Sequence, residues 1–294
     1  MTLRSTLATV LQQEQINFLL TNRIPRRQLT RLIGWFSRIE NPWLCRLSIA
    51  VWRLFVELDL SDARKREFTS LHDCFTRELQ AGARCIDADP RVLASPCDAL
   101  VGATGSISDG TVLQAKGQAY PLEELLLDRE LVRYYLGGSY ATLRLTAGMY
   151  HRFHAPAECR VEQVTYVTGD TWNVNPVALQ RVERLFCRNE RATVRCRLPS
   201  AELITLVPIA AILVASIRLH FLDVLLHLKY DGPNVIACDA RQHKGQEMGW
   251  FQHGSTMIVF APAGFQLCEA IRPGARIHMG QALFRRRPTS AAGD

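Results

Sequence analysis

Long apolar runs and low-complexity tracts are both missing from this 294-residue sequence. The longest apolar run, residues 203–217, has 15 residues and contains Pro208, whereas a membrane-spanning helix needs about 20 apolar residues. Leu, Ile, Val and Phe are nevertheless plentiful, so the chain can bury a core. These features exclude a polytopic helical membrane protein and an intrinsically disordered chain. The opening residues also lack the continuous apolar segment of a signal peptide, so we expect none.

Short cysteine and glycine motifs are missing as well. None of the nine cysteines forms a Cys-x-x-Cys pair, which excludes a zinc knuckle and a thioredoxin-like site. With no signal peptide expected, the cysteines are predicted to be reduced thiols in a cytoplasmic compartment. No glycine-rich phosphate-binding fingerprint occurs. Because no Gly-x-Ser-x-Gly element occurs either, the sequence argues against a serine hydrolase of the common type.

Acidic residues are scarce at the N-terminal end. Residues 1–56 contain eight arginines against only Glu14 and Glu40, a net charge of +6 out of the +7 of the whole chain. The rest of the chain is therefore close to neutral. This segregated positive charge indicates an anionic partner, for which nucleic acid and an anionic membrane surface both qualify.

Two helices are predicted in the same basic segment, over residues 31–39 and 43–56. In each segment two arginines lie seven residues apart, close to two helical turns, so they share a face while Trp, Phe, Leu and Ile cover the rest. A basic amphipathic helix that carries tryptophan suits the headgroup region of a bilayer. The same pattern also suits two ordinary helices docked on a core, and the residues alone leave both interpretations open.

Beyond residue 59 the pattern changes to that of strands. One more helix is predicted over residues 69–79. Residues 192–198 alternate between apolar and polar, which is typical of a half-buried strand, and residues 161–168 are rich in β-branched side chains. We expect Pro208 to split its apolar run into two buried strands. The sequence thus predicts an α+β fold, with a helical N-terminal quarter followed by a compact β-rich domain.

Four side chains have the chemistry of a catalytic centre. Asp98 follows a Pro-Cys pair, His151 and His154 lie three residues apart, and Ser255 follows a glycine. Two histidines with an aspartate and a serine are typical of acid–base and nucleophilic catalysis. A His-x-x-His pair also suits a metal, but no third ligand stands at a recognisable spacing, so no metal site is predicted. Taken singly, each of these residues is more often an ordinary hydrogen-bonded core or turn residue.

Short motifs occur in a fixed order along the chain. They are Gly82-Ala-Arg-x-Ile-Asp87, Pro96-x-Asp98, Ala115-Lys-Gly117, Tyr150-His-Arg-x-His-x-Pro156, Arg188-Asn-Glu-Arg191 and Lys244-Gly-Gln-Glu-Met-Gly-x-Phe-x-x-Gly-Ser-Thr256. In this order and spacing they make the sequence similar to the phosphatidylserine decarboxylases of the bacterial, pyruvoyl-dependent type. The resemblance covers nearly the whole chain, and residues 244–256 are its most specific part.

The resemblance implies a proenzyme that cuts its own backbone between Gly254 and Ser255. In that family the serine hydroxyl attacks the carbonyl of the preceding glycine, which converts the amide to an ester. β-Elimination then frees the upstream chain, and hydrolysis of the dehydroalanine leaves a pyruvoyl group as the covalent cofactor, which in this chain would come from Ser255. The products would be fragments of 254 and 40 residues. A glycine before the serine suits this step because it leaves the carbonyl approachable.

The resemblance also implies roles for three further residues. Asp98 and His154 correspond to a charge-relay pair, in which Asp98 orients the imidazole and His154 accepts the proton of Ser255. His151 is associated with the decarboxylation itself. The pyruvoyl ketone forms a Schiff base with the serine amine of phosphatidylserine, and it takes up the electrons that remain when carbon dioxide leaves. Phosphatidylethanolamine is the product, and no external cofactor is needed.

The same resemblance implies an organisation for the whole chain. Residues 1–65 are expected to form a basic, amphipathic region that associates with membranes, and residues 66–294 a β-rich, barrel-like catalytic domain. An anionic lipid substrate favours a membrane over nucleic acid as the partner of the N-terminal arginines. We therefore expect phosphatidylserine and an anionic membrane surface as partners, and a homodimer of cleaved protomers. The expected location is peripheral, on the cytoplasmic face of the cell membrane.

Some positions depart from the family pattern. Ala99 stands where the family usually has a glycine after the aspartate, and His253 stands where a leucine usually precedes Gly-Ser-Thr. These substitutions motivate a second hypothesis, a non-catalytic descendant that keeps the fold and binds lipid surfaces. A generic Ser-His-Asp hydrolase is the third.

Overall fold

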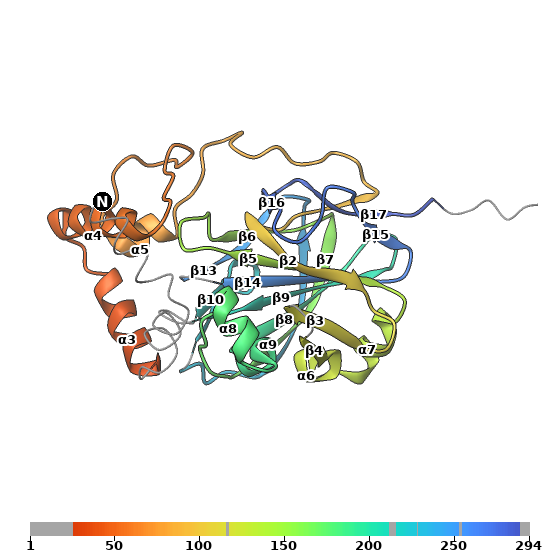
Figure 1. Ribbon diagram of the computed structural model, residues 1–294. Helices are drawn as coiled ribbons and strands as arrows, with labels where there is room; N and C mark the ends of the chain where they lie inside the picture. Colours follow the sequence, from red (N-terminus) through yellow and green to blue (C-terminus); the bar gives the residue numbers. More distant parts are fainter. Residues whose placement is uncertain (1–25, 116–117, 212–215, 228, 253–254, 289–294) are drawn as a thin grey trace, which may run out of the picture.

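The computed structural model describes residues 26–115, 118–211, 216–227, 229–252 and 255–288. Its first elements are the helices α3 (Arg26–Ser37) and α4 (Pro42–Phe55), which extend to one side of the strands (Figure 1). The Asn41 side chain caps α4 by accepting the Leu44 N–H, and Pro42 stands at the start of the helix. Both helices predicted in this region are confirmed. The first 25 residues of the predicted 1–65 region lie outside the described residues.

The third predicted helix is much shorter than expected. It is a single turn, α5 (Leu71–Phe75), capped by the Ser70 hydroxyl. The Thr76 carbonyl, which would continue the helix by accepting from residue 80, instead accepts two hydrogen bonds from the Arg152 guanidinium at 2.9 and 2.7 Å. This tertiary contact ends the helix.

The described residues contain an eight-stranded sheet in which every neighbouring pair is antiparallel. Its spatial order is β12 (Val235–Gln242), β7 (Cys159–Val167), β8 (Arg191–Arg197), β9 (Leu203–Ile209), β14 (Ser255–Ala261), β5 (Ser139–Leu145), β2 (Ala99–Ser106) and β16 (Arg276–Ile277). β14 lies between β9 and β5, and all of its residues are buried. We call this the main sheet.

Two smaller sheets cover one face of the main sheet. Their strands are β11 (Val224–His227), β10 (Ser216–Leu219), β13 (Glu247–Phe251) and β6 (Arg152–His154) in one, and β1 (Val92–Ala94), β17 (Ala282–Arg286) and β15 (Phe265–Leu267) in the other. The short helix η1 (His220–Leu222) links β10 to β11. Side chains such as Phe153, Phe251 and Phe284 from these sheets share one hydrophobic core with Leu143 and Met257 of the main sheet.

The opposite face is covered by a hairpin and four short helices. These are β3 (Thr111–Ala115), β4 (Gln118–Pro121), α6 (Leu122–Leu126), α7 (Arg129–Tyr135), α8 (Pro176–Arg181) and α9 (Leu185–Arg188). The second core lies beneath them and contains Ile258 and Phe260, which alternate along β14 with Met257 and Val259 of the first core. Both faces of the central strands β9 and β14 are therefore buried, whereas the edge strand β12 keeps alternate residues exposed.

Two predictions about strands need correction. The strand predicted at 192–198 is β8, but it is not half-buried, because α6 and α9 cover its second face and Thr193 is buried there. Pro208 does not separate two strands of one apolar run, since it lies inside β9. On the side of β8, Ile209 and Leu206 have paired residues but Pro208 has none. Proline has no N–H to donate to a neighbouring strand, so it is tolerated at this point.

The predicted barrel-like form is wrong. In the described residues the main sheet is open, with β12 and β16 as its edge strands. The two smaller sheets bury one face and the helices bury the other, so the sheet does not have to close on itself to hide its apolar side chains. None of the described helices has both the length and the apolar character that a membrane crossing requires.

Candidate active site

Ser255 is the first residue of β14 and is completely buried. It pairs with Leu145 at the end of β5. Its hydroxyl makes no hydrogen bond with any described residue. Since an unpaired hydroxyl in a protein interior costs free energy, this arrangement favours a group kept available for chemistry. Gly254, which the resemblance places at the cleaved bond, and His253 lie outside the described residues.

His154 ends β6, opposite Glu247 of β13, and is buried. Its Nδ1 lies 2.9 Å from the Gly245 carbonyl oxygen, and its Nε2 lies 2.9 Å from the Tyr150 hydroxyl oxygen. Because a carbonyl only accepts, Nδ1 carries the proton of the neutral ring and the Tyr150 hydroxyl donates to Nε2. Burial lowers the pKa of His154 below its ordinary value of about 6.5, and the Gly245 carbonyl offsets only part of this effect. His154 is therefore a neutral imidazole at pH 7.

Asp98 lies directly before β2, and its carboxylate is fully engaged. Arg84 donates to both oxygens, from Nε to Oδ1 at 3.0 Å and from Nη2 to Oδ2 at 2.6 Å, and the Met279 N–H donates to Oδ1 at 2.8 Å. His278 Nδ1 lies 3.4 Å from Oδ2. Burial acts to raise the pKa of Asp98, but the bonds from Arg84 and Met279 outweigh it and hold the pKa below its ordinary value. Asp98 is therefore ionised at neutral pH, with Arg84 as its counterion.

The hydrogen bond expected between Asp98 and His154 is absent from the described residues, which corrects that part of the prediction. The two segments are neighbours, since the His154 N–H donates to the Pro96 carbonyl at 2.8 Å. The imidazole nevertheless turns to Tyr150 and Gly245, and the carboxylate turns to Arg84. A two-point, charge-assisted bond from a guanidinium is stronger than any bond that a neutral imidazole can offer to the same carboxylate.

His151 is the other buried histidine of the motif. Its Nδ1 lies 2.8 Å from the Met149 carbonyl oxygen, and its ring packs on Phe75 with 4.0 Å between the ring centroids. Phe75 stacks in turn on Trp52 of α4, at 5.6 Å. The orientation of this imidazole is thus fixed by the chain before it and by aromatic rings from the N-terminal helices.

The two histidines occupy different places along β13. His154 lies opposite Glu247, at the start of the strand, whereas the His151 carbonyl accepts from the Phe251 N–H at 2.9 Å, at its end. Three residues of extended chain span about 10 Å. His151 therefore contacts the end of β13 that is followed in the chain by Ser255, and His154 contacts the opposite end.

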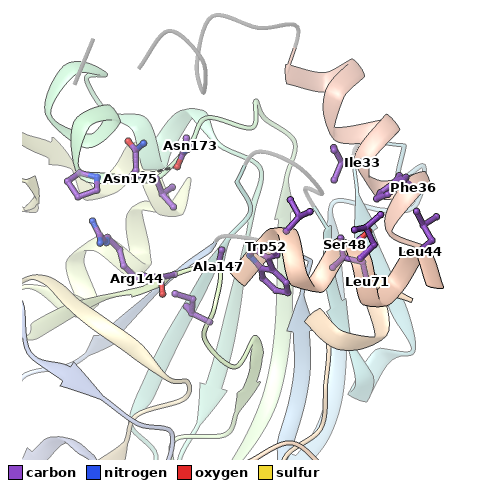
Figure 2. A pocket seen from close by; sticks show the side chains of 16 residues that line it. Ile33, Phe36, Leu44, Ser48, Trp52, Leu71, Arg144, Ala147, Asn173 and Asn175 are labelled. Atoms are coloured by element: carbon purple, nitrogen blue, oxygen red, sulfur yellow. Dashed lines mark hydrogen bonds between the residues drawn. The ribbon is translucent and has the colours of Figure 1, made fainter. Parts of the chain in front are cut away.

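Two cavities adjoin at the loop of residues 146–150 between β5 and β6. The polar cavity, of about 900 Å³, is lined by charged and polar groups that include Arg84, Asp98 and Tyr150. The apolar cavity, of about 730 Å³, lies between α3 and α4 on one side and the segment before α8 on the other (Figure 2). Thr146 and Ala147 line both cavities. Leu145, which precedes them and pairs with Ser255, also lines the apolar cavity, whereas the fully buried Ser255 lines neither cavity.

The sequence did not identify three residues as members of this site. Arg84 and Tyr150 stand inside motifs given above, but a motif does not show which of its members contacts Asp98 or His154. Arg144 stands in no motif, and only its position on β5 brings it to the apolar cavity. Among the described residues, no three His, Cys, Asp or Glu side chains gather as a candidate metal site.

Comparisons with known proteins agree with the family suggested by the motifs. A family model described as phosphatidylserine decarboxylase matches residues 71–285. The phosphatidylserine decarboxylase proenzyme of Aliivibrio salmonicida is 34% identical over 279 residues, which cover 87% of this chain and 93% of that protein. The proenzymes of Brevibacillus brevis and Haemophilus influenzae are 32% and 34% identical, over 90% and 88% of this chain and 95% and 92% of their own lengths. The chain belongs to the phosphatidylserine decarboxylase family of carboxy-lyases, as its motifs predict.

Proposed function

We propose that this protein converts phosphatidylserine into phosphatidylethanolamine and carbon dioxide, after cutting its own chain between Gly254 and Ser255. The observation that carries the proposal is the state of Ser255. Its hydroxyl is buried and has no hydrogen-bond partner among the described residues, and its strand partner Leu145 lines the apolar cavity directly before the two residues that also line the polar cavity. A charged headgroup and an acyl chain need these two environments side by side.

For the cut, the Ser255 hydroxyl adds to the carbonyl carbon of Gly254, and an ester replaces the peptide bond. Loss of the Ser255 α-proton expels the carboxylate of residues 1–254, and water converts the resulting dehydroalanine into a pyruvoyl group with release of ammonia. No bond to a described residue has to break before the hydroxyl attacks. A base must accept the hydroxyl proton. His154 suits this role by way of Tyr150, because the imidazole is neutral and the Tyr150 hydroxyl that donates to its Nε2 can give up its own proton to the ring as it takes up the proton of Ser255.

Position 255 fits a pyruvoyl group. It opens a strand that is buried throughout and is paired on both sides, with β5 and with β9. The group supplies a ketone that binds the substrate amine and accepts the electron pair released with carbon dioxide. The paired strands hold this position rigid and keep bulk water away from it.

We assign the proton that replaces carbon dioxide on the substrate to His151. Its ring is buried and packed on Phe75, and its carbonyl contacts the end of β13 that is followed in the chain by Ser255. Asp98 acts as a positioning residue in this scheme. Held by Arg84 and Met279, it fixes the segment whose Pro96 carbonyl binds the His154 backbone.

The same proposal places α3 and α4 on an anionic membrane surface, at the cytoplasmic face of the cell membrane. Large apolar side chains of these helices are exposed, namely Leu32, Trp35, Trp43, Leu47, Val51, Leu54 and Phe55. Arg31, Arg46 and Arg53 are exposed on the same helices, and Arg38 is exposed directly after α3. An apolar patch with tryptophan, flanked by arginines, is typical of proteins that lie in the headgroup layer of a bilayer. The homodimer that the resemblance implies stays a prediction.

A denaturing gel and an intact mass test the cut. The wild-type protein should separate into fragments of 254 and 40 residues, and the smaller one should carry a pyruvoyl group instead of an amino terminus. Ser255→Ala should remain one intact chain. Ser139→Ala is the matched control, because Ser139 is buried at the other end of the β5–β14 pair, opposite Ala261, and it should be cut like the wild type. An intact wild-type chain, or a free amino group on the smaller fragment, would overturn the proposal.

The non-catalytic alternative makes a different prediction for the same preparation. It expects binding to phosphatidylserine vesicles without any phosphatidylethanolamine. Mass spectrometry of the extracted lipids separates the two hypotheses, since turnover eliminates the alternative and vesicle binding without turnover supports it.

A further inference from the structure

Arg144 is a charged residue at the boundary of the apolar cavity. It stands on β5 one residue before Leu145 and pairs with Thr256, the residue after Ser255. Side chains alternate along β5, so Arg144 lies on the face of the main sheet that the helices cover, while Leu145 enters the first core. The Arg144 side chain lines both the apolar cavity and a neighbouring cavity of about 440 Å³ beside α8.

Arg144 differs from the other arginines that lie inside the protein. Arg77 donates to the Gly148 carbonyl, Arg152 is paired with Glu247, and Arg191 donates to several carbonyls. Arg144 is half-buried and has no hydrogen bond or ion pair with a described residue. Burial lowers the pKa of its guanidinium, and no carboxylate counters that effect. An arginine nevertheless stays charged in a protein. The fold therefore holds a positive charge at this cavity without a counterion among the described residues.

The apolar cavity has two chemically different ends. In Figure 2, Arg144 and the side chains of Asn173 and Asn175 lie at one end, and the apolar side chains of α3 and α4 lie at the other. Leu47 and Val51 line the cavity and also belong to the exposed apolar surface of α4. An apolar chain can therefore pass from the membrane-facing surface into the cavity and reach Arg144.

We infer that Arg144 binds the phosphodiester of phosphatidylserine, with the acyl chains lying along the α3–α4 wall of the apolar cavity. The inference rests on the proposed function and adds to it a subsite for the lipid phosphate. A guanidinium matches the oxygens of a phosphate diester with two parallel hydrogen bonds. The strand register places Arg144 and Ser255 next to each other along the main sheet but on its opposite faces, because Leu145, the residue after Arg144, is the one that pairs with Ser255. The phosphate and the reacting amine of phosphatidylserine, which are separated by only a few bonds, would therefore lie on either side of the end of β5, where Thr146 and Ala147 line both cavities.

Steady-state kinetics of the cleaved protein test this subsite, with short-chain phosphatidylserine in detergent micelles as substrate. Arg144→Gln should raise KM by about 10- to 100-fold, the loss expected for a charge-assisted hydrogen bond, and should change kcat much less. Arg144→Lys keeps the charge but not the two-point geometry, so its KM should lie between those of the wild type and Arg144→Gln. The matched control is Arg160→Gln, on β7, where the arginine already has Glu162 and Asp239 as partners. It should keep the wild-type KM.

Competition by two soluble anions identifies the source of the phosphate. Glycerophosphoserine should compete with the lipid more strongly than inorganic phosphate does in the wild-type protein, and it should lose that advantage in Arg144→Gln. A KM for Arg144→Gln equal to that of Arg160→Gln, or equal competition by the two anions in the wild type, would overturn the subsite.

Self-cleavage and the thermal midpoint are followed on the same samples. All variants should be cut, and Arg144→Gln should unfold at or above the wild-type temperature, because it removes a charge without a partner among the described residues. A wild-type protein that is neither cut nor active refutes the proposed function, whereas an active wild type with an unchanged Arg144→Gln KM refutes only the subsite.

Discussion

Removal of Arg84 should destabilise the protein far more than removal of a surface arginine. The Arg84 side chain is 13% exposed and that of Asp98 is 7% exposed, and they meet through two charge-assisted bonds. Arg84→Met leaves the Asp98 carboxylate buried without its counterion. Breaking a buried pair in this way costs about 3–5 kcal/mol. The exposed pair Arg64–Glu78, with side chains 70% and 46% exposed, is the matched control, and Arg64→Met should cost at most about 1 kcal/mol.

The loss of stability caused by Arg84→Met should depend on pH. In the wild type, Arg84 and Met279 hold the pKa of Asp98 below its ordinary value, so this carboxylate stabilises the fold above about pH 4 and the contribution is lost as pH falls through the lowered pKa. Without Arg84, burial raises the pKa of Asp98 instead. The isolated carboxyl then takes up a proton as pH falls, and the difference in stability between variant and wild type narrows from pH 7 toward pH 4.

Urea unfolding in a Ser255→Ala background measures these effects on a chain that stays intact. The double variant Arg84→Met/Asp98→Asn should recover most of the loss, because the amide is neutral and its oxygen still accepts the Met279 N–H. Two results would refute the description of Arg84 and Asp98 as a buried pair that needs both partners. One is a loss of unfolding free energy for Arg84→Met as small as that for Arg64→Met. The other is a difference in stability between Arg84→Met and the wild type that stays constant between pH 7 and pH 4.

Two further predictions concern the cut and the membrane. Self-cleavage, followed as fragment formation over time, should fall as pH decreases, with its midpoint below pH 6.5, because burial lowers the pKa of His154. Tyr150→Phe should slow self-cleavage at least about fivefold through loss of the bond to Nε2. A midpoint above pH 6.5 would contradict this. Leu54→Asp on α4 should lower the affinity for phosphatidylserine vesicles, measured by sedimentation, about tenfold or more. The control is Leu136→Asp, after α7, which should leave this affinity unchanged although Leu136 is similarly exposed, at 44% against 50% for Leu54. Equal effects of the two substitutions would contradict the proposal that α4 binds the membrane.

Local patterns in the sequence were sufficient for several elements of the fold. Arginines at helical spacing identify α4, and a run of β-branched residues identifies β7. The same patterns did not show how the strands combine into layers. Thr193 is polar and would be expected at the surface, yet it is buried because other elements cover the second face of β8. The barrel-like expectation failed for the same reason, since closure depends on which faces other elements cover.

The candidate site was likewise predictable only in part from the sequence. Motif order pointed to Asp98, His151, His154 and Ser255, and the structure shows all four buried. It was not predictable that Arg84 would bind Asp98 or that Tyr150 would bind His154, because each contact depends on the relative strength of competing partners. A neutral histidine and a guanidinium compete for one carboxylate, and the guanidinium forms the stronger bond.

The position of Ser255 in the main sheet would allow the chain to be cut between residues 254 and 255, as proposed, and to stay folded. β14 is paired with β5 along its whole length and with β9 along most of it, and the cut precedes its first residue. Beyond β14, the C-terminal fragment contributes β16 to the main sheet and β15 and β17 to one of the smaller sheets. The proposed cut at 254–255 would therefore break none of these strand pairs, and release of the 40-residue fragment would require two sheets to open. A cut inside β14 would leave unpaired strand ends in the core, whereas a cut at its first residue changes the chemistry of position 255 and keeps its surroundings intact.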